Sequence, residues 1–307
     1  RGRYGGSGHA PLIFALTGID NALHDIVGKA LNVPVYQLLG GKFRDTLRLY
    51  ADCHAGETSD PQAYADKALE VVAEGYTAVK FDVDNAVEGK LDPYSWTVGA
   101  REMNQVIKLI EGLREALGYA TDLAIDCHGQ FDLPSAITLA KAVEPLRLLW
   151  LEEPVPAENL DALAQVRRSS STVICTGENQ YTRFEFLEMF ERKATDVIMP
   201  DLAKAGGIAE GKRIADIADA HYIPIAPHNV SSPLGMMAAC HVMAAVPNFL
   251  VLEFHGRMIS WWNDLCDGEQ PFIERGFMRV SERPGIGVEL NEKNAKALLW
   301  NDDTYFD

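Results

Sequence analysis

Six ionisable side chains recur along the chain at nearly constant spacing, and each of them closes a short apolar run. The successive intervals are 26, 26, 23, 27 and 25 residues. Such a period fits one strand, one helix and two short loops, and this repeat would bring all six side chains to the same ends of parallel strands. The six residues are Asp126, Glu152, Glu178, Asp201, His228 and Glu253. We therefore expect a polar ring at one end of a barrel.

Three carboxylates of this ring come from successive strands, so their oxygen atoms are expected to converge. They belong to Asp126, Glu152 and Glu178, which we call the carboxylate triad. Three uncompensated anions would repel one another by several kcal/mol, and a divalent cation removes that conflict. Ligands that are all oxygen select Mg²⁺ first and Mn²⁺ second over Zn²⁺. For a single acid, a helix cap or a lysine partner would be the simpler interpretation, but three in register favour a metal site.

A carboxylate and an imidazole follow on the next two strands, at Asp201 and His228. A carboxylate beside a histidine fixes the tautomer of the ring and stabilises its protonated form. A histidine held in this way can act as the general base that takes a proton from a weak carbon acid. A single histidine at a strand end is commonly a packed core residue, but its place opposite the carboxylate triad favours catalysis.

Eight short apolar runs provide the strands that this ring requires, because parallel strands buried on both faces are apolar throughout. Eight strands also close a barrel. The runs cover residues 46–52, 77–84, 123–127, 148–153, 172–178, 195–201, 222–228 and 248–254. Amphipathic stretches with helix signals lie between them, such as Asp60 and Pro61 in N-cap and N1 order. This alternation predicts an α/β fold with a TIM-like barrel.

Composition excludes some classes of partner. The chain has 307 residues with 47% hydrophobic content, which is ordinary for a soluble globular protein, and no apolar run reaches membrane-spanning length. The net charge of −16 speaks against nucleic acid and anionic membranes, although it leaves a small anionic substrate open. The five cysteines are odd in number and scattered, which is typical of reduced core thiols in a cytoplasmic protein.

Consecutive motifs carry a family resemblance over nearly the whole chain. They read AIDCHG, WLEEP, TGENQ, MPDLAKAGGI, APHNVSS and LEF, after an opening GIDNALHDIVGKALNVPVYQLLGG. In this order they resemble the mandelate racemase subgroup of the enolase superfamily. The resemblance implies a (β/α)7β barrel, Mg²⁺ on the carboxylate triad, and Asp201 with His228 as the base. It also implies that Glu253 orients or donates to the substrate carboxylate, and it selects Glu152 over Glu153.

The family chemistry that this resemblance implies is abstraction of a proton α to a carboxylate, and two further residues bear on it. Lys80 and Asp82 lie on one face of their strand and resemble the family's KxK motif, with Asp82 in place of the second lysine. That lysine is the second base of a racemase, so its absence argues against racemisation. Asp82 is left as a weaker base or as a contact for a substrate hydroxyl.

Two histidines bear on the step that follows the enolate. His128 in DCHG resembles the histidine that protonates the departing β-hydroxyl in galactonate- and gluconate-type acid-sugar dehydratases. Loss of hydroxide requires such an acid, because hydroxide is a poor leaving group. The alternative is a histidine that only packs over the metal site. His255, just beyond Glu253, either contacts the substrate or ends the last strand. Lys204, three residues past Asp201, is interpreted as a salt-bridge partner in the sixth loop rather than as a catalyst.

The resemblance also implies an α+β capping domain, of which this chain is expected to hold remnants at both ends. We assign residues 1–45 to the C-terminal part of the N-terminal cap, 46–275 to the barrel and 276–307 to the C-terminal return to the cap. The chain thus begins near the closing helices of that cap.

These observations predict a magnesium-dependent dehydratase, a hydro-lyase that converts an aldonic or aldaric acid into a 2-keto-3-deoxy acid. We expect a cytoplasmic homo-oligomer with a small acid-sugar substrate and no nucleic-acid or membrane partner. One alternative is a cycloisomerase or epimerase that shares the enolate but keeps the hydroxyl. A second alternative is a catalytically silent barrel that only binds metal.

Overall fold

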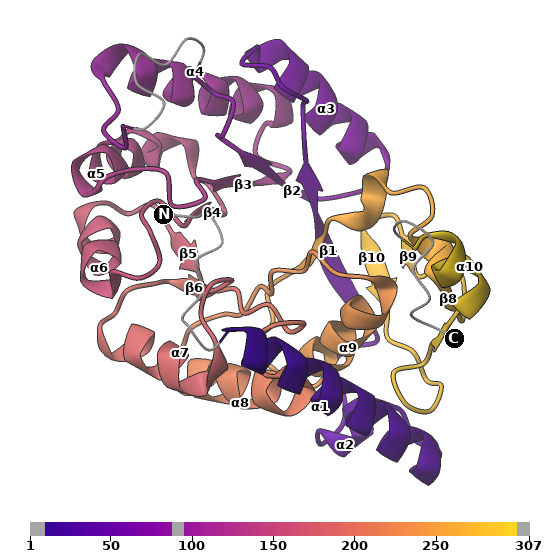
Figure 1. Ribbon diagram of the computed structural model, residues 1–307. Helices are drawn as coiled ribbons and strands as arrows, with labels where there is room; N and C mark the ends of the chain where they lie inside the picture. The colour runs from indigo at the N-terminus through magenta and orange to yellow at the C-terminus, as the bar shows by residue number, and fades with distance from the viewer. Residues whose placement is uncertain (1–9, 88–94, 300–307) are drawn as a thin grey trace.

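A closed ring of parallel strands forms the centre of the protein, in a computed structural model that describes residues 10–87 and 95–299 (Figure 1). The strands pair in parallel in the order β6-β5-β4-β3-β2-β1, and β7 pairs with the other edge of β1. Ile225 closes the ring through bridges to Ile198 of β6 and Phe249 before β7. The strands are β1 (Thr46–Cys53), β2 (Ala78–Asp82), β3 (Asp122–Asp126), β4 (Trp150–Glu152), β5 (Ile174–Thr176), β6 (Val197–Ile198) and β7 (Leu252–Phe254).

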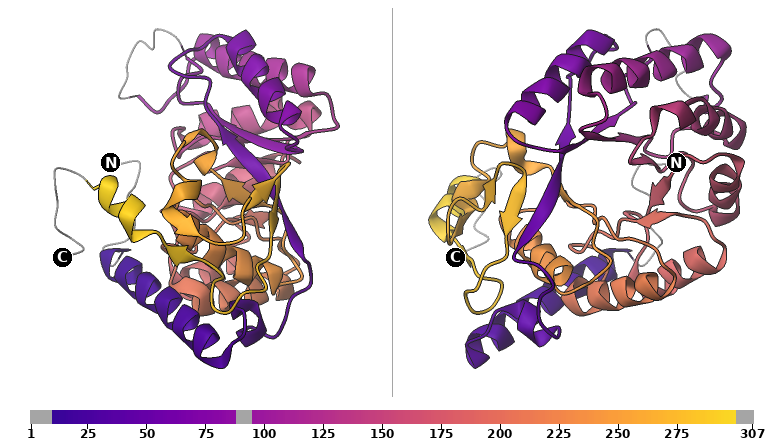
Figure 2. Two further views of the ribbon diagram at one scale, coloured as in Figure 1. Left: turned by 90° about the vertical axis from the view of Figure 1, so that its right-hand side faces the viewer. Right: turned by 180° about the vertical axis from the view of Figure 1, so that it is seen from behind.

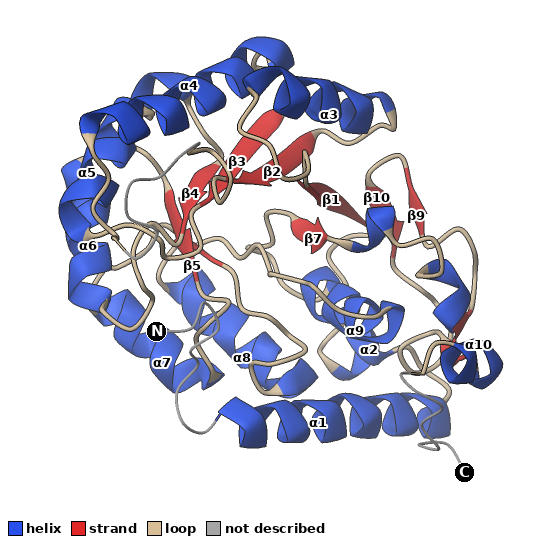
Figure 3. Cartoon of the chain, turned by 45° about the horizontal axis from the view of Figure 1, so that its top comes forward, coloured by secondary structure: helices blue, strands red, loops and turns tan. Residues whose placement is uncertain are grey.

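Within the described residues, seven helices connect the eight strand positions and enclose them (Figure 3). Side chains at their N-termini begin several of them: Asp60 accepts a hydrogen bond from Gln62 N at 3.0 Å, and Asp132 accepts one from Ser135 N at 2.8 Å. The helices are α3 (Pro61–Ala73), α4 (Ala100–Leu117), α5 (Leu133–Ala142), α6 (Leu160–Ser169), α7 (Thr182–Glu191), α8 (Gly207–Ala220) and α9 (Pro233–Ala244). The predicted α/β fold with a (β/α)7β barrel is therefore confirmed.

Strand alternation divides the core into two parts. One part fills the inside of the barrel, and the other lies between the strands and the helices. On β3, Ala124 belongs to the inner cluster, whereas Leu123 and Ile125 belong to the outer one. The inner cluster consists of Tyr50, Ala78, Ala124, Trp150, Cys175, Val197, Met199, Ala226 and Val251. Because side chains two positions apart on a strand point to the same side, the polar residues that follow two positions after members of the inner cluster also point to the barrel axis, at the carboxyl ends of the strands.

The first and last elements of the described chain pack outside the ring (Figure 2). Helix α1 (Ala10–Leu31) lies along α8 and satisfies its first backbone N–H groups, since Asn21 Oδ1 accepts from Ile208 N and Asp20 Oδ2 from Ala209 N, both at 3.0 Å. Strand β10 (Phe277–Arg279) pairs antiparallel with β1. The remaining elements are α2 (Val35–Leu38), η1 (Glu144–Leu146), η2 (Gly256–Met258), η3 (Asn263–Leu265), β8 (Cys266–Asp267), β9 (Ile273–Glu274), β11 (Glu289–Leu290) and α10 (Glu292–Ala297).

Two predicted strands are much shorter than expected. The run 222–228 makes ladder contacts only at Ile225, and the run 195–201 forms a strand only at Val197–Ile198. Pro224, Pro227 and Pro200 interrupt these runs, and proline has no N–H to donate to a ladder. All five cysteines are buried and free, as expected for core thiols. None of the helices in the described residues is long and apolar enough to cross a membrane.

Candidate active site

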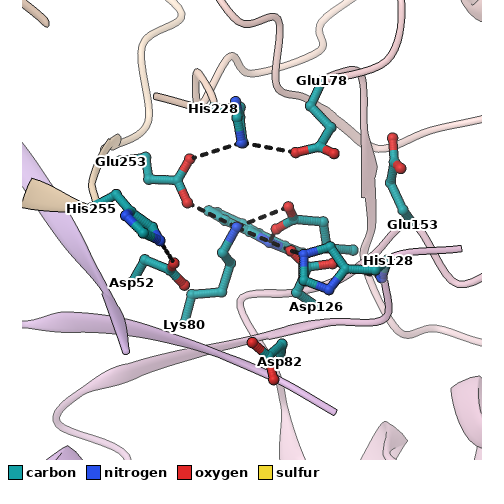
Figure 4. Close-up of polar contacts among 12 residues, drawn as sticks. Asp52, Lys80, Asp82, Asp126, His128, Glu153, Glu178, His228, Glu253 and His255 are labelled. Carbon is teal, nitrogen blue, oxygen red and sulfur yellow. Dashed lines mark hydrogen bonds and ion pairs between the residues drawn. The ribbon is translucent and has the colours of Figure 1, made fainter. Parts of the chain in front are cut away.

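The six predicted ring residues lie together at the carboxyl ends of the barrel strands, and all of them are buried. Figure 4 shows four of them, Asp126, Glu178, His228 and Glu253. The ladder register explains part of this arrangement. Asp82, Asp126 and Glu152 are direct neighbours across β2, β3 and β4. Because register partners in a parallel sheet point to the same side, these three carboxylates line one wall of the barrel mouth.

Lys80 is the central cation of the site. Its Nζ lies 3.2 Å from Asp126 Oδ2, 3.0 Å from Glu152 Oε1 and 2.8 Å from Glu253 Oε1. Trp150 Nε1 donates to the other oxygen of Glu152 at 2.9 Å. Burial opposes the charge on Lys80, but Glu152 and Glu253 outweigh it and raise the lysine pKa well above its ordinary value. Lys80 is therefore a fixed positive charge between the acids.

The two adjacent glutamates of WLEEP point to different partners. Glu152 faces Lys80, whereas Glu153 accepts hydrogen bonds from Thr176 Oγ1 at 3.0 Å and Asn179 Nδ2 at 2.8 Å. Burial, followed by the charge of Glu178, raises the pKa of Glu153 to about 8. Glu152 is thus the member of the pair that shares a cation with Asp126.

The site carries more negative than positive charge, and a bound divalent cation would neutralise the excess. Besides Glu153, which burial keeps neutral at neutral pH, five buried carboxylates (the triad, Asp201 and Glu253) face two lysines, Lys80 and Lys204, and His228. With these groups ionised and His228 protonated, five negative against three positive charges leave an excess of two. Burial and then Asp126 raise the pKa of Glu152 well above its ordinary value, as expected for an undercompensated acid. The all-oxygen chemistry of the triad suits a hard divalent ion, but its three carboxylates are not among the groups of described residues whose possible ligand atoms all lie within 4.8 Å of one another, so the convergence of their oxygens stays a prediction.

His228 is held between acids on both ring nitrogens. Its Nδ1 lies 2.8 Å from Asp201 Oδ2, and its Nε2 lies 2.9 Å from Glu178 Oε2. Burial alone would lower the pKa of His228, but Glu253 and Glu178 outweigh it and raise the pKa well above the ordinary value. Lys204 Nζ lies 3.1 Å from Asp201 Oδ2, so the predicted ion pair of Lys204 is confirmed. Asp201 thus fixes the ring and leaves Nε2 directed into the site.

Glu253 is ionised in this arrangement. Burial would raise its pKa, but Lys80 and His228 lower it below the ordinary value, and Asn229 N donates to its Oε2 at 2.7 Å. The side chain therefore accepts hydrogen bonds here, whereas the family resemblance left donation open.

His128 lies on the opposite side of the ring from His228. Strand β3 and the segment of Ile225 are four positions apart in the ring of eight. His128 Nδ1 lies 3.1 Å from Asp84 Oδ1, and its Nε2 lies 3.4 Å from Asp126 Oδ2. Burial lowers the pKa of His128, but Asp84 and Asp126 outweigh this effect and raise it to about 9. The imidazole is therefore protonated at neutral pH and can donate a proton.

Asp82 and His255 take part in a second polar cluster, which includes two residues that the sequence did not single out. His54 Nδ1 lies 3.3 Å from Asp82 Oδ2, and Asp52 Oδ2 lies 3.0 Å from His255 Nε2. Asp84, the partner of His128, was missed as well. Asp52 closes the first apolar run in the same way that the six ring residues close theirs, so the rule that found them would also have found Asp52.

Comparison with known proteins shows the family to which the chain belongs. A family model described as enolase C-terminal domain-like matches residues 63–294, and a model of the N-terminal domain of mandelate racemase and muconate lactonizing enzyme matches residues 5–40. The D-xylonate dehydratase of Haloferax volcanii is 43% identical over 303 residues, which are 98% of this chain and 73% of that protein. The D-galactonate dehydratase of Variovorax paradoxus is 32% identical over 291 residues, which are 93% of this chain and 74% of that protein.

A solved structure gives a comparable match. The mandelate racemase/muconate lactonizing enzyme-like protein of Rubrobacter xylanophilus is 47% identical and superposes with a TM-score of 0.92. The match covers 96% of this chain and 79% of that chain. The chain thus spans about three quarters of the length of these three relatives.

Proposed function

The chain belongs to the mandelate racemase/muconate lactonizing enzyme family of enolase-like proteins, and from this premise we propose that it is a magnesium-dependent dehydratase of an acid sugar. The substrate class is an aldonic or aldaric acid, and the product is a 2-keto-3-deoxy acid. The dehydratase names of relatives that are 43% and 32% identical support this class of reaction.

In this proposal the neutral form of His228 removes the proton α to the substrate carboxylate, which requires that Glu178, the acid now paired with its Nε2, binds the metal instead. Its buried contact with Asp201 keeps the imidazole oriented, and the direction of Nε2 into the carboxylate cluster supports the role. Lys80 is buried beside the triad, where it would pair with the charge that develops on the substrate carboxylate. A Mg²⁺ ion held by Asp126, Glu152 and Glu178 would supply electrostatic stabilisation of the same charge. Mn²⁺ satisfies the same oxygen ligands.

The second step is loss of the β-hydroxyl, and we assign its proton donor to His128. The observation that carries the proposal is the position of this imidazole, which is paired with Asp84 and Asp126 on the side of the ring opposite to His228. A base on one side and an acid on the other divide deprotonation and departure of hydroxide between two groups. Asp82 and His255 lie at the barrel mouth, where they would contact hydroxyl groups of the substrate. Glu253 would orient the reacting carboxylate through Lys80.

Incubation with a library of aldonates and aldarates tests the proposal, with D-xylonate, D-gluconate and D-galactonate first. We expect a 2-keto acid whose mass is one water less than that of the substrate. An isomer with an unchanged oxygen count would instead indicate a cycloisomerase or epimerase. Failure to exchange the α-proton of any substrate would indicate a silent barrel. The cytoplasmic location, the homo-oligomeric state and the domain boundaries expected from the sequence stay predictions.

A further inference from the structure

Asp52, His54 and His255 bring three possible metal-ligand atoms together beside the carboxylate triad, at the carboxyl ends of β1 and β7. The two imidazole Nε2 atoms face each other at 3.3 Å. Asp52 Oδ2 lies 3.0 Å from His255 Nε2 and 3.5 Å from His54 Nε2. Three donor atoms from three side chains therefore surround one point.

The sheet register fixes this cluster. Ala51 pairs with Phe254, so the next residues, Asp52 and His255, follow side by side. Cys53 pairs with Phe81, so His54 and Asp82 follow side by side on the other edge of β1. Asp52 lies on β1 itself, and His54 and His255 directly follow the last residues of β1 and β7, so the paired strands limit their movement more than a long loop would. The approach of the two histidines is thus a consequence of the barrel itself.

The distances match those between ligands of one transition-metal ion. Ligands at zinc–nitrogen and zinc–oxygen bond lengths of about 2.0–2.2 Å in tetrahedral geometry lie about 3.3 Å from one another. The alternative is a hydrogen bond between the two Nε2 atoms, with one ring donating to the other. That bond would not include the carboxylate of Asp52. A cation at the centre satisfies all three contacts at once.

A further carboxylate is placed as a metal-bound histidine requires. His54 Nδ1 lies 3.3 Å from Asp82 Oδ2, on the side of the ring away from Nε2. Such a partner fixes the tautomer and makes Nε2 a better ligand. The side chains of His54 and His255 are 44% and 31% exposed, so an ion can enter from solvent. This contact also gives Asp82 a role as the hydrogen-bond acceptor of His54, which a lysine at the same position, as in the family's KxK motif, could not provide.

We infer that Asp52, His54 and His255 form a second cation site, separate from the carboxylate triad, for a divalent transition ion such as Zn²⁺. Two imidazoles with one carboxylate select a borderline ion over Mg²⁺, which prefers oxygen ligands. Three protein ligands leave a coordination position open toward the barrel mouth, where water or a hydroxyl group can bind.

A second group of possible ligands, formed by Asp82, Asp84 and His128, is a poorer candidate. It contains a single imidazole, and Asp84 Oδ1 already accepts a hydrogen bond from Gln130 Nε2. His128 is also paired with Asp126 of the triad. We therefore assign the transition ion to the cluster on β1 and β7.

Zinc titration of the metal-free chain in saturating Mg²⁺ tests the inference, because Mg²⁺ would fill the oxygen site proposed on the carboxylate triad. Calorimetry and metal analysis after dialysis should give one Zn²⁺ per chain. His54→Gln and His255→Gln should each lower the zinc affinity more than tenfold, and Asp82→Asn should lower it about tenfold through the orientation of His54. His221→Gln, at the exposed end of α8, is the matched control and should bind zinc like the parent.

The far-ultraviolet circular dichroism of each metal-free variant shows whether it folds, and Asp126→Asn should keep the zinc because it changes only the other site. Absence of zinc binding by the parent would overturn the inference and leave a hydrogen-bonded histidine pair. Equal zinc affinity in the parent and in both folded histidine variants would also overturn it. Loss of zinc in Asp126→Asn alone would assign the ion to the carboxylate triad instead.

Discussion

Acidification is expected to destabilise the fold through one buried histidine. His241 on α9 is fully buried, and its Nδ1 accepts a hydrogen bond from Tyr36 N at 3.3 Å. Burial lowers the pKa of His241 from 6.5 to about 4. The folded protein therefore keeps this ring neutral, whereas the unfolded chain takes up a proton as soon as the pH falls below about 6.5.

The size of the effect follows from the difference between the two pKa values. Stability from neutral His241 is present in full above the unfolded pKa of 6.5 and is lost as the pH falls toward the folded pKa of about 4. One pKa unit corresponds to about 1.4 kcal/mol, so the total loss is about 3 kcal/mol. About 2 kcal/mol of it should be lost by about pH 5, where most of the unfolded chains carry the proton.

Urea unfolding at about pH 8 and about pH 5 measures this loss, and a variant separates it from other titrating groups. His241→Asn keeps an acceptor near Nδ1 but cannot titrate, so it should lose about 2 kcal/mol less than the parent on acidification. Exposed His221→Asn is the matched control and should follow the parent. Parallel stability curves for the parent and His241→Asn would refute the reasoning.

Three further predictions concern the metal, the base and a helix cap. Chelation should abolish turnover and lower the melting temperature, and Mg²⁺ should restore both, because the carboxylate triad repels itself without a cation; full activity in excess chelator would contradict this. His228→Asn should eliminate turnover and solvent exchange of the α-proton while Mg²⁺ binding persists, and surviving exchange would assign the base elsewhere, to Lys80 or Asp82 first. Asp60→Ala should lower the free energy of unfolding by about 1 kcal/mol, and an unchanged urea midpoint would show that its bond to Gln62 N contributes nothing.

The regular spacing of strand-end residues was sufficient to predict the barrel, because each βα unit has a similar length and ends at the same face. The same spacing predicted the contact between His228 and Asp201, which the structure shows at the ends of neighbouring strand positions. The extent of the strands was harder to predict. Apolar runs such as 222–228 look like strands in sequence, but Pro224 and Pro227 remove the N–H groups that a ladder needs.

Contacts between neighbouring strands of the ring that are far apart in sequence could not be read from the spacing. His54 and His255 are 201 residues apart, and only closure of the sheet between β7 and β1 brings them together. The contact of Asp82 with His54 likewise depends on the register between β1 and β2. Spacing along the chain indicates which end of a strand a residue occupies, but neighbours in the ring are set by which strands pair.

The central claim is that two histidines divide the reaction, and His128→Gln tests it most directly. The variant leaves the triad and the pair of His228 with Asp201 intact, so it should still exchange the α-proton with solvent. It should form 2-keto product about 10²–10⁴-fold more slowly than the parent, as expected for a lost general acid. Exchange and product formation are followed together in deuterated buffer, after Mg²⁺ binding has been verified because His128 lies 3.4 Å from Asp126. Turnover at the parent rate would contradict the account and make His128 a packing residue.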